Sequence, residues 1–573
     1  MSAPGTAPDT GREPWPARLL DRLPAGGLLL GLVFFSLALT PSLIPRQFLM
    51  QGVLCGAAFA AGYGIGVSLE WLWDFLQIPR PPRPVERRIK FFAIAGGGML
   101  ALAFLWLSTG WQNSILVLMG RPAVETNQPI FVTLVAIVPA MVLIGLGTLF
   151  VWGVRAVSRR LRRIIPRRVA FVAGVIIVGA LVGGIVDGII LRWTLATADR
   201  FYADLDALAG LYEEPPVNPL LSGSAQSLIR WETIGLDART YVRSGPTAAE
   251  IEAITERPAE LPLRVYVGLR SADSPEARAE LALAEMIRIG AFERSILVLI
   301  MPVGTGWVDP PAIDTLEMLH GGDVASVAVQ YSYLTSWLSL VVEPEVGTAT
   351  AQALFTTVYR HWTGLDPETR PKLYLHGLSL GAYASQASAT IYDVLADPYS
   401  GAFWVGTPFA TPGWRSATAS REPGTPIWRP RIGNGSVVRF YNQTGGGIEA
   451  GQWGPLRIVY LQYPSDPIVF FETSLAYRAP PWLSGPRPPD VSTQFNWYPV
   501  VTALQMLVDM ALAQTSPIGF GHVYAPQHYF DGWVTLTDPA GWTKEALADL
   551  REKLSRTGPR QLIEGGWFRS TPS

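Results

Sequence analysis

Ser379 stands at the centre of a Gly-x-Ser-x-Gly pattern in the segment LYLHGLSLGAYAS, residues 373–385. A serine in this pattern is a candidate nucleophile, because the two glycines allow a sharp turn that projects its hydroxyl. The chain has 56 glycines in 573 residues, so the pattern alone is weak evidence. Its context is stronger, because an apolar strand is expected at 372–378 and a helix at 380–396. The N-terminus of that helix would favour negative charge beside the serine, so we predict that Ser379 is a nucleophile.

A nucleophile in this kind of turn needs a carboxylate and a histidine, which follow it in that order along the chain. Asp466 ends the predicted strand 456–466, where a carboxylate would reach the same edge of a parallel sheet as the serine. The alternative role of Asp466 is an Asx turn before the following proline. Asp490 and Asp509 are weaker candidates for the acid, since they lie in a Pro-rich loop and an amphipathic helix. We predict that Asp466 is the acid.

Two histidines follow Asp466, namely His522 in GFGHVYAP and His528 in PQHYFDGW. A glycine precedes His522 in a short loop, which suits a base that must project freely, so we predict the triad Ser379, Asp466 and His522. His528 stands next to two aromatic residues and is expected to pack or hydrogen-bond behind the site as a supporting residue. The other histidines are expected at helix ends and in the core: His320, His361 and His376.

An acyl-transfer site also needs two N–H donors for the oxyanion. The residue after the nucleophile, Leu380, would supply one of them. The second is expected from the glycine-rich segment PVGTGWVDP, residues 302–310, which follows a buried apolar strand. Within it, Gly304 and Thr305 are the candidates. The alternative is that this segment forms an ordinary glycine turn.

Strands and helices alternate from about residue 260 onward. Expected strands are 263–269, 295–302, 324–334, 372–378, 401–409, 437–443 and 456–466, and the clearest helices are 274–292, 348–362 and 380–396. Several of the strands are apolar throughout, which is typical of strands buried on both faces. The pattern predicts a mostly parallel sheet that is covered on both faces by helices.

The composition indicates a membrane part joined to a folded part. Hydrophobic residues make up 49% of the chain and charged residues 16%, and the mean hydropathy is +0.24. The net charge of −1 gives no sign of a nucleic-acid partner. Cys55 is the single cysteine, so an intrachain disulfide and a cysteine-built metal cluster are excluded. We expect neither a cofactor nor a metal ion.

Five apolar runs are long enough to span a bilayer, at about 25–44, 51–78, 92–112, 129–154 and 168–194. The connections 79–90 and 155–168 are rich in arginine, which the positive-inside rule places in the cytoplasm. An odd number of spans would then put the C-terminal part outside the cytoplasm, with the protein in the plasma or inner membrane. We predict four regions: a cytoplasmic tail (1–24), a five-span domain (25–195), a helical and loop connector (196–260) and a catalytic domain (261–573).

Glycines recur at small-xxx-small spacing in the second and fifth runs, which allows helices to pack closely within one chain or between two copies of it. These glycines are Gly52, Gly56, Gly62 and Gly66, and Gly179, Gly183, Gly184 and Gly188. A homo-oligomer formed through these runs is one expectation, and the ordinary abundance of glycine in spans is the other. Glu70, Asp74 and Asp187 are ionisable residues in or near spans, and the sequence leaves their role open.

In its combined motifs the chain resembles the polytopic membrane α/β-hydrolases of actinobacteria and α-proteobacteria. The resemblance rests on the five apolar runs together with PVGTGW, HGLSLGAYAS, YPSDPIVFF and GFGHVY followed by DGW. It implies an α/β-hydrolase fold and serine chemistry, but no defined substrate. One departure is that no final strand is evident between Asp466 and His522. That interval holds a Trp- and Pro-rich loop and an apolar stretch, residues 497–514, which would suit a lid or cap helix.

The predicted function is therefore a membrane-anchored serine hydrolase that acts on a lipid or envelope ester. An acyltransferase with the same triad is the nearest alternative, because an alcohol in place of water would receive the acyl group. A membrane receptor or transporter with a degenerate hydrolase domain is an alternative from another class, which the complete order of triad residues disfavours.

Overall fold

The computed structural model of the chain describes residues 24–185, 188, 214–333, 344–446, 451–483 and 485–557. The chain divides into two compact units. The helical unit contains the residues up to Gly183 together with Thr473–Leu483 and Val491–Asp509. The sheet unit contains Gly184–Glu472, Ser484–Asp490 and the residues from Met510 onward. Each unit is described by itself below.

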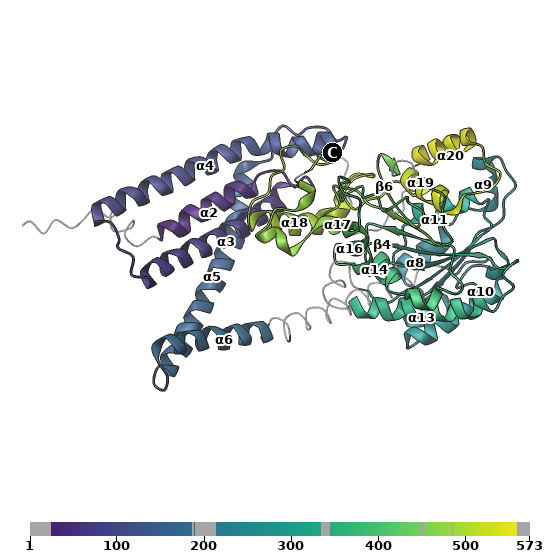
Figure 1. Cartoon of the computed structure of the whole chain (residues 1–573), viewed down its shortest axis with the longest axis horizontal. Helices are drawn as coiled ribbons and strands as arrows, with labels where there is room; N and C mark the ends of the chain where they lie inside the picture. Colours follow the sequence, from purple (N-terminus) through teal and green to yellow (C-terminus); the bar gives the residue numbers. More distant parts are fainter. Residues whose placement is uncertain are drawn as a thin grey trace, which may run out of the picture. The chain divides into compact units, whose positions relative to one another are not determined.

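The sheet unit is built on an eight-stranded sheet with the order β1-β3-β2-β4-β5-β8-β6-β7 (Figure 1). All neighbouring strands are parallel except the short pair β6–β7. The strands are β1 (Leu263–Val267), β2 (Ile296–Met301), β3 (Val324–Val329), β4 (Lys372–Leu378), β5 (Gly401–Val405), β6 (Val438–Asn442), β7 (Gly445–Gly446) and β8 (Arg457–Leu461). Every residue of β1, β2, β3 and β5 is buried, which explains their apolar sequences.

Helices cover both faces of this sheet (Figure 1). On one face α10, α13 and α14 pack together, and on the other α11 packs against α19. The helices are α8 (Leu236–Arg243), α9 (Ala248–Thr255), α10 (Pro275–Arg288), α11 (Pro310–Leu319), α13 (Pro344–Thr363), α14 (Leu380–Gln386), α15 (Ile391–Val394), α16 (Pro412–Ala419), α17 (Pro467–Phe470), α19 (Pro526–Thr537) and α20 (Lys544–Thr557). The short 3-10 helices are η3 (Trp231–Thr233), η4 (Leu269–Ser271), η5 (Ala291–Glu293) and η8 (Ala513–Thr515). The predicted parallel sheet is thus confirmed.

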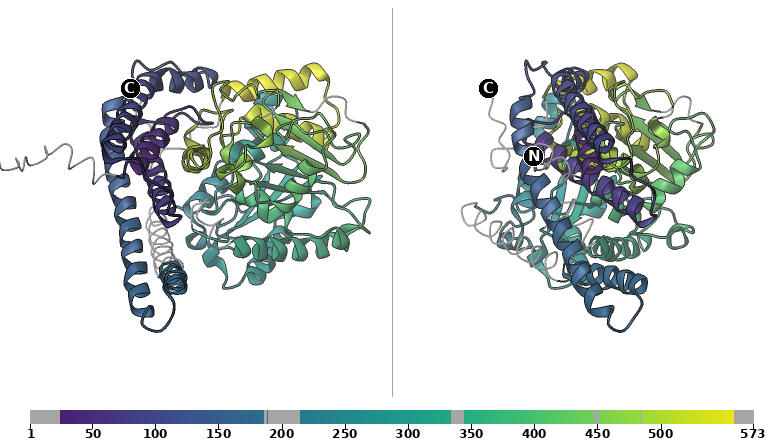
Figure 2. Two further views of the ribbon diagram at one scale, coloured as in Figure 1. Left: turned by 60° about the vertical axis from the view of Figure 1, so that its left-hand side comes forward. Right: turned by 90° about the vertical axis from the view of Figure 1, so that its left-hand side faces the viewer.

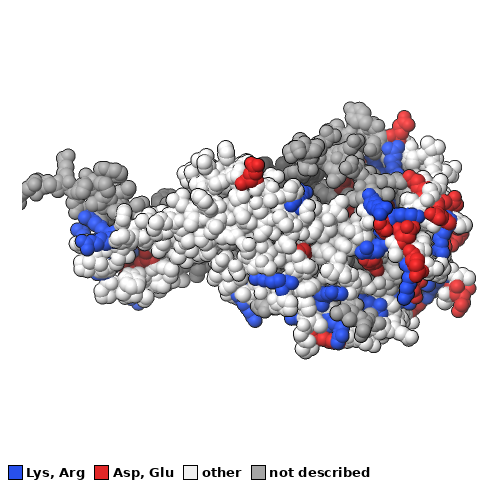
Figure 3. Space-filling view, turned by 90° about the horizontal axis from the view of Figure 1, so that it is seen from above, with Lys and Arg blue, Asp and Glu red and all other residues white. Residues whose placement is uncertain are grey.

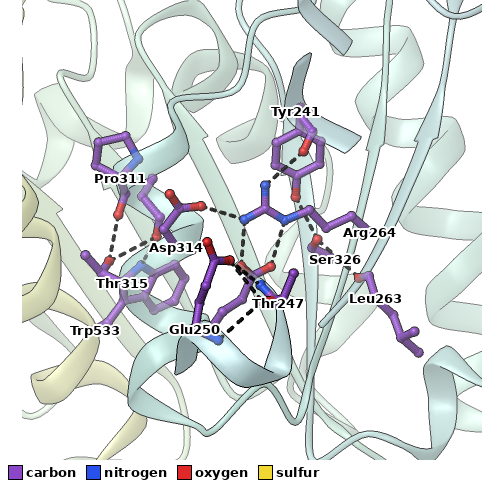
Figure 4. Close-up of polar contacts among 12 residues, drawn as sticks. Tyr241, Thr247, Glu250, Leu263, Arg264, Pro311, Asp314, Thr315, Ser326 and Trp533 are labelled. Carbon is purple, nitrogen blue, oxygen red and sulfur yellow. Dashed lines mark hydrogen bonds and ion pairs between the residues drawn. The ribbon is translucent and has the colours of Figure 1, made fainter. Parts of the chain in front are cut away.

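A buried ion-pair network fastens α11 to strand β1 (Figure 4). The guanidinium of Arg264 donates to Glu317 through Nε at 2.9 Å and Nη2 at 2.6 Å, and Nη2 also lies 2.6 Å from Asp314. Trp533 of α19 donates its indole N–H to the carbonyl of Ala312 at 2.6 Å. Removing one member of a buried pair leaves the other charge uncompensated, at a cost of about 3–5 kcal/mol. The network therefore fixes the helix that follows the 302–309 loop.

The order of the last strands explains why no strand precedes His522. Strand β6 comes before β8 in the chain but lies beyond it in the sheet. The position at this edge is therefore already filled when the chain leaves β8. Among the described residues between 467 and 521 there is no strand. The chain reaches His522 through helices and loops instead.

Among the described residues, four helices are long and apolar enough to span a membrane, rather than the predicted five. They are α3 (Phe48–Phe75), α4 (Arg83–Leu118), α5 (Pro129–Leu161) and α6 (Arg167–Ile185). The first predicted span is wrong in its length, because α2 covers only Ala25–Ala38. Its 14 residues rise about 21 Å, short of a hydrocarbon core of about 30 Å. Pro41 and Pro45 follow directly and prevent the helix from continuing.

The surface of the long helices fits a lipid environment. Large apolar side chains are exposed on it, including Trp106 at 85%, Ile130 at 72% and Leu102 at 69%. In Figure 3 the long helices are mostly free of charge along their length, and Lys and Arg gather at one end. Such a large apolar surface is rare on a protein that faces water alone. The helices therefore indicate a membrane protein.

Close packing explains the glycines of α3. A Cβ atom at Gly52 or Gly56 would overlap α5, and one at Gly62 or Gly66 would overlap α2. The glycine stripe of α3 is thus used inside the chain. By contrast, a Cβ at Gly179, Gly183, Gly184 or Gly188 would meet nothing within 4 Å in the described parts of the chain. If two copies of the chain contact each other through these predicted glycines, they would use Gly179, Gly183, Gly184 and Gly188, and this contact stays a prediction.

Two of the three ionisable residues singled out in the apolar runs have structural partners. Glu70 accepts the backbone N–H of Gly26 at 2.5 Å and so caps the start of α2. Asp74 forms an ion pair with Arg80, with Oδ2 and Nη2 2.7 Å apart. Asp187 lies outside the described residues.

Two later segments, Thr473–Leu483 and Val491–Asp509, belong to the helical unit and include η6 (Thr473–Ala476), η7 (Pro481–Leu483) and most of α18 (Val501–Leu512). Val501 belongs to the same buried cluster as Leu39 and Leu54, and α18 lies beside α2 and α3 (Figure 2). Asp509 pairs with Arg46 at 3.3 Å, and both side chains are fully buried. The apolar stretch that suited a lid or cap helix is therefore part of the core of the helical unit.

Candidate active site

Ser379 occupies a strained turn between β4 and α14. Its backbone has φ 56° and ψ −124°, which is unusual for a residue with a side chain. A Cβ at Gly377 would overlap the backbone of Gly381, and a Cβ at Gly381 would overlap the carbonyl oxygen of Met301. Both glycines of the sequence pattern are therefore required, one by the turn itself and one by the passage of α14 across the end of β2.

Asp466 and His522 are brought together although 56 residues separate them. His522 Nδ1 lies 2.6 Å from Asp466 Oδ2, and both side chains are buried. The other carboxylate oxygen, Oδ1, accepts the N–H of Ile468 at 2.9 Å and caps α17. Asp466 thus makes the Asx turn that was its alternative role and also binds the histidine, using a different oxygen for each.

The ring of His522 lies against the backbone turn that follows strand β5, next to the strand that leads to Ser379. Ser379 donates its N–H to the carbonyl of Val405 at 2.9 Å, and the next residue, Gly406, has φ +52°. A Cβ at Gly406 would lie 2.6 Å from His522 Cε1, so only glycine leaves room for the ring. His522 Nε2 is buried and has no hydrogen-bond partner among the described residues, the hydroxyl of Ser379 included. Contacts of this kind are often long in a site without substrate.

Two backbone carbonyl groups of the glycine-rich loop after β2 accept hydrogen bonds from side chains. Tyr266 of β1 donates to the carbonyl of Gly306 at 2.6 Å, and Gln330 donates to that of Thr305 at 3.2 Å. Within the described parts of the chain, the N–H groups of Gly304, Thr305 and Leu380 have no protein acceptor. The loop and the start of α14 lie side by side, because Gly381 packs against the end of β2. These donors are therefore free to bind a developing oxyanion.

His528 lies one contact further from the centre of the site. Its Nδ1 is 2.6 Å from the hydroxyl of Tyr463, and burial lowers the pKa of His528 to about 4. The Tyr463 ring stacks on Tyr524 with centroids 4.3 Å apart, and Tyr524 donates to Asp466 Oδ2 at 2.7 Å. Among the described residues, this chain of contacts through the two tyrosines links His528 to Asp466. Sequence reasoning missed both tyrosines, although each lies beside a motif residue, in YPSD and in GHVY.

The remaining three histidines lie in a strand or at the ends of helices. His376 is buried in β4, its Nδ1 lies 2.9 Å from the carbonyl oxygen of Phe403, and burial lowers its pKa to about 4. His320 ends α11 with Nε2 2.9 Å from the hydroxyl of Thr537. His361 lies in the last turn of α13. In the part of the chain that the structure describes, no group of three or more His, Cys, Asp or Glu residues is arranged to hold a metal ion.

Asp309 is a second buried carboxyl group near the site, which the sequence did not single out. It precedes α11 but does not cap it, and its Oδ2 accepts the hydroxyl of Tyr529 at 2.6 Å. Burial raises the pKa of Asp309 to about 7, an effect opposed by the Tyr529 hydrogen bond and by the positive charge that His522 can carry. The only signal in the sequence is its place at the end of PVGTGWVDP.

Comparison with known proteins gives a match to one family over both parts of the chain. A model described as "Alpha/beta-hydrolase family" matches residues 263–550. A second, described as "Alpha/beta-hydrolase family N-terminus", matches residues 39–246. No curated protein and no solved structure matches the chain.

Proposed function

Because the chain belongs to this α/β-hydrolase family, as its motifs indicated, we propose that it is a membrane-anchored serine hydrolase that cleaves carboxylic esters. Ser379 Oγ attacks the ester carbonyl while His522 Nε2 takes the hydroxyl proton. Asp466 holds the Nδ1 proton of the ring and stabilises the imidazolium that forms. The imidazolium then protonates the leaving alcohol, and water releases the acyl group by the same steps.

The N–H groups of Leu380 and of Gly304 or Thr305 would bind the oxyanion of the tetrahedral intermediate. Their carbonyl partners and the packing of Gly381 hold them in place before the reaction begins, so little reorganisation is needed when charge develops. Removing one such donor typically costs about 100- to 1000-fold in turnover. No step of this mechanism calls for a cofactor.

One observation carries this proposal: the 2.6 Å contact between Asp466 and His522, with Nε2 buried and unpartnered in the part of the chain that the structure describes. A histidine that only stabilised the fold would be expected to use both ring nitrogens, as buried polar groups usually do. The strained backbone of Ser379 points the same way, since such strain persists mainly at functional sites. Both features also disfavour a receptor or transporter with a degenerate domain.

We place the site on the outer side of the membrane and its substrate among lipid or envelope esters. Because α2 is too short to span, an odd count of spans no longer supports this orientation. It rests on the arginine-rich connection 155–168 before α6, which would put the far end of α6 on the outer side, and the apolar surface of the long helices supports the attachment to a bilayer. A reaction site tethered at a membrane meets amphipathic esters at high local concentration.

Acyl transfer is a second candidate that one observation favours. Ser379 is only 4% exposed and His522 Nε2 is shielded from solvent. A closed site slows the attack of water on an acyl-enzyme and gives an alcohol acceptor an advantage. Measuring how an acyl-enzyme partitions between water and an added sugar or lipid alcohol separates the two reactions.

Labelling with a fluorophosphonate tests the proposal. The wild-type protein in mild detergent should be labelled, and Ser379→Ala should not be, while both elute as folded protein in size-exclusion chromatography. Ser385→Ala is the matched control, because Ser385 lies on the same helix with its hydroxyl 3.0 Å from Trp404 Nε1. Labelling of Ser379→Ala at the wild-type rate would refute the assignment. Lipid profiling of envelope extracts with and without active protein then identifies the substrate.

A further inference from the structure

The loop that carries Asp466 and the loop that carries His522 are joined by more than the contact between these two residues. Ser465 Oγ accepts the N–H of Gly521 at 2.9 Å, so the residues just before the acid and just before the base are bonded. On the other side, the hydroxyl of Tyr463 accepts the N–H of Ala525 at 2.9 Å. Two backbone N–H groups of the histidine loop, one on each side of His522, are therefore bonded to side-chain hydroxyls of the acid loop.

A third segment holds the acid loop in turn. Asp490 Oδ2 accepts the N–H of Ser465 at 3.0 Å and the side-chain N–H of Gln443 at 2.6 Å. Gln443 directly follows strand β6, so Asp490 connects the acid loop to the edge of the sheet. Asp490 is only 4% exposed, and its other oxygen has no hydrogen-bond partner among the described residues. Ser465 is fully buried.

These bonds matter because no strand leads into His522. A strand would fix the start of the histidine loop through its ladder of hydrogen bonds. Here the described residues before His522 are helical or irregular, and Gly521, with φ +55°, adds no stiffness of its own. The backbone next to the base is bonded through Gly521 to Ser465 and through His522 N–H to the carbonyl of Ala513 at 3.1 Å.

We propose that Ser465 and Asp490 form a positioning pair, which sets the place of His522 relative to the nucleophile in the absence of a final strand. This inference rests on the proposed serine-hydrolase function. Neither residue touches the reacting atoms: Ser465 acts through Gly521 on the histidine, and Asp490 acts through Ser465. The pair requires an oxygen acceptor at position 490 and not a charge. Burial raises the pKa of Asp490, which fits an acceptor whose negative charge is not used.

Three variants test the proposal on the full-length protein in mild detergent, with a short-chain nitrophenyl ester as the probe. Ser465→Ala removes the acceptor for Gly521, and Asp490→Ala removes the acceptor for Ser465. Each should lower kcat by about 10- to 100-fold, since a displacement near 1 Å at a catalytic group costs about 100-fold, while KM changes less than about threefold. Asp490→Asn should keep kcat within about threefold, because its amide oxygen can replace Oδ2 and its nitrogen can occupy the place of the unpartnered oxygen.

Ser274→Ala is the matched control for a loss of stability alone. Ser274 also accepts a backbone N–H, that of Ala277 at 3.1 Å, but it caps α10, which carries none of the residues assigned to the site. It should lower the thermal midpoint comparably and leave kcat unchanged. The proposal is overturned if Ser465→Ala and Asp490→Ala turn over at the wild-type rate, or if Asp490→Asn is as impaired as Asp490→Ala. Labelling of Ser379→Ala would instead show that the proposed function itself fails, and this inference with it.

Discussion

The ion pair between Arg46 and Asp509 provides a quantitative test of how the C-terminal half of the chain enters the helical unit. Both side chains are fully buried, and Asp509 also accepts the N–H of Leu43 at 3.0 Å. Asp509→Ala leaves the guanidinium of Arg46 buried without its counter-charge. We expect the free energy of unfolding to fall by about 3–5 kcal/mol, the usual cost of breaking a buried pair.

Replacing both partners at once should be far less harmful. In Arg46→Met combined with Asp509→Leu no charge remains buried. The donors that lose Asp509, among them the N–H of Leu43, cost about 1–3 kcal/mol each when left unpaired, but they lose it in Asp509→Ala as well. The double variant should therefore be more stable than Asp509→Ala. Denaturant titration in detergent micelles, followed by tryptophan fluorescence, of the wild type, Arg46→Met, Asp509→Leu and the double variant measures the full mutant cycle.

Asp549→Ala is the control for this cycle. Asp549 pairs with Lys553 at 2.9 Å, but both side chains are substantially exposed, so the change should be within about 0.5 kcal/mol. If Asp509→Ala is as mild as Asp549→Ala, or if the two substitutions at the buried pair are simply additive, the segment does not pack as described. If Asp509→Ala instead lost most of its turnover without losing stability, residues 497–514 would act as a lid.

Four further predictions concern the site and the topology. His522→Ala should lower kcat/KM for a short-chain nitrophenyl ester by about three orders of magnitude or more, and His528→Ala by about tenfold or less; the opposite order would reassign the base. Gly381→Ala places a Cβ against a backbone carbonyl at the end of β2, so it should abolish fluorophosphonate labelling or folding, and full labelling would contradict the close approach of α14 to β2. The pKa of Asp309 is raised to about 7, so between about pH 4 and pH 7 the folded protein keeps a proton that the unfolded chain has lost. This group therefore stabilises the fold at low pH, and the stabilisation is lost as the pH rises to 7. Relative to Asp309→Asn, the wild type should therefore lose about 2 kcal/mol of stability between pH 5 and pH 7, measured by denaturant titration at both values, and parallel pH dependences would refute it. A reporter that is active only after export, fused after Ser573, should be active, whereas activity of a cytoplasm-only reporter would reverse the proposed orientation.

The parts of the site that could be predicted are those that short-range rules determine. The glycines around Ser379 are required by a turn of a few residues, so the pattern and its flanking strand and helix were sufficient. The order of acid and histidine along the chain limited the candidates, and the strand end at Asp466 and the glycine before His522 favoured these two, which the structure brings to 2.6 Å from each other. The environment of His528 was also readable, because its aromatic neighbours indicated packing rather than free projection.

The parts that could not be predicted depend on contacts between distant segments. Tyr524 and Asp490 are assigned by their bonds to Asp466 and Ser465, and no local pattern distinguishes them from ordinary tyrosine and aspartate residues. Strand order has the same character, since an apolar strand such as β6 does not encode which edge it joins. The length of α2 differs from the predicted span for a local reason: the apolar run continues past Ala38, but Pro41 and Pro45 end the helix.

Residues 491–509 belong to the helical unit although they come from the C-terminal half of the chain. Gln505 donates to the carbonyl of Thr40 at 3.0 Å, Asp509 holds Leu43 and Arg46, and Val501 packs with Leu39 and Leu54. These partners all come from the first 60 residues, whereas the donors and acceptors that they meet come after residue 500. A fragment that began at the sheet would carry α18 with a bare carboxylate and an apolar face that has lost its partner. The N-terminal helices therefore complete the packing of residues 491–509, and membrane attachment alone does not account for them.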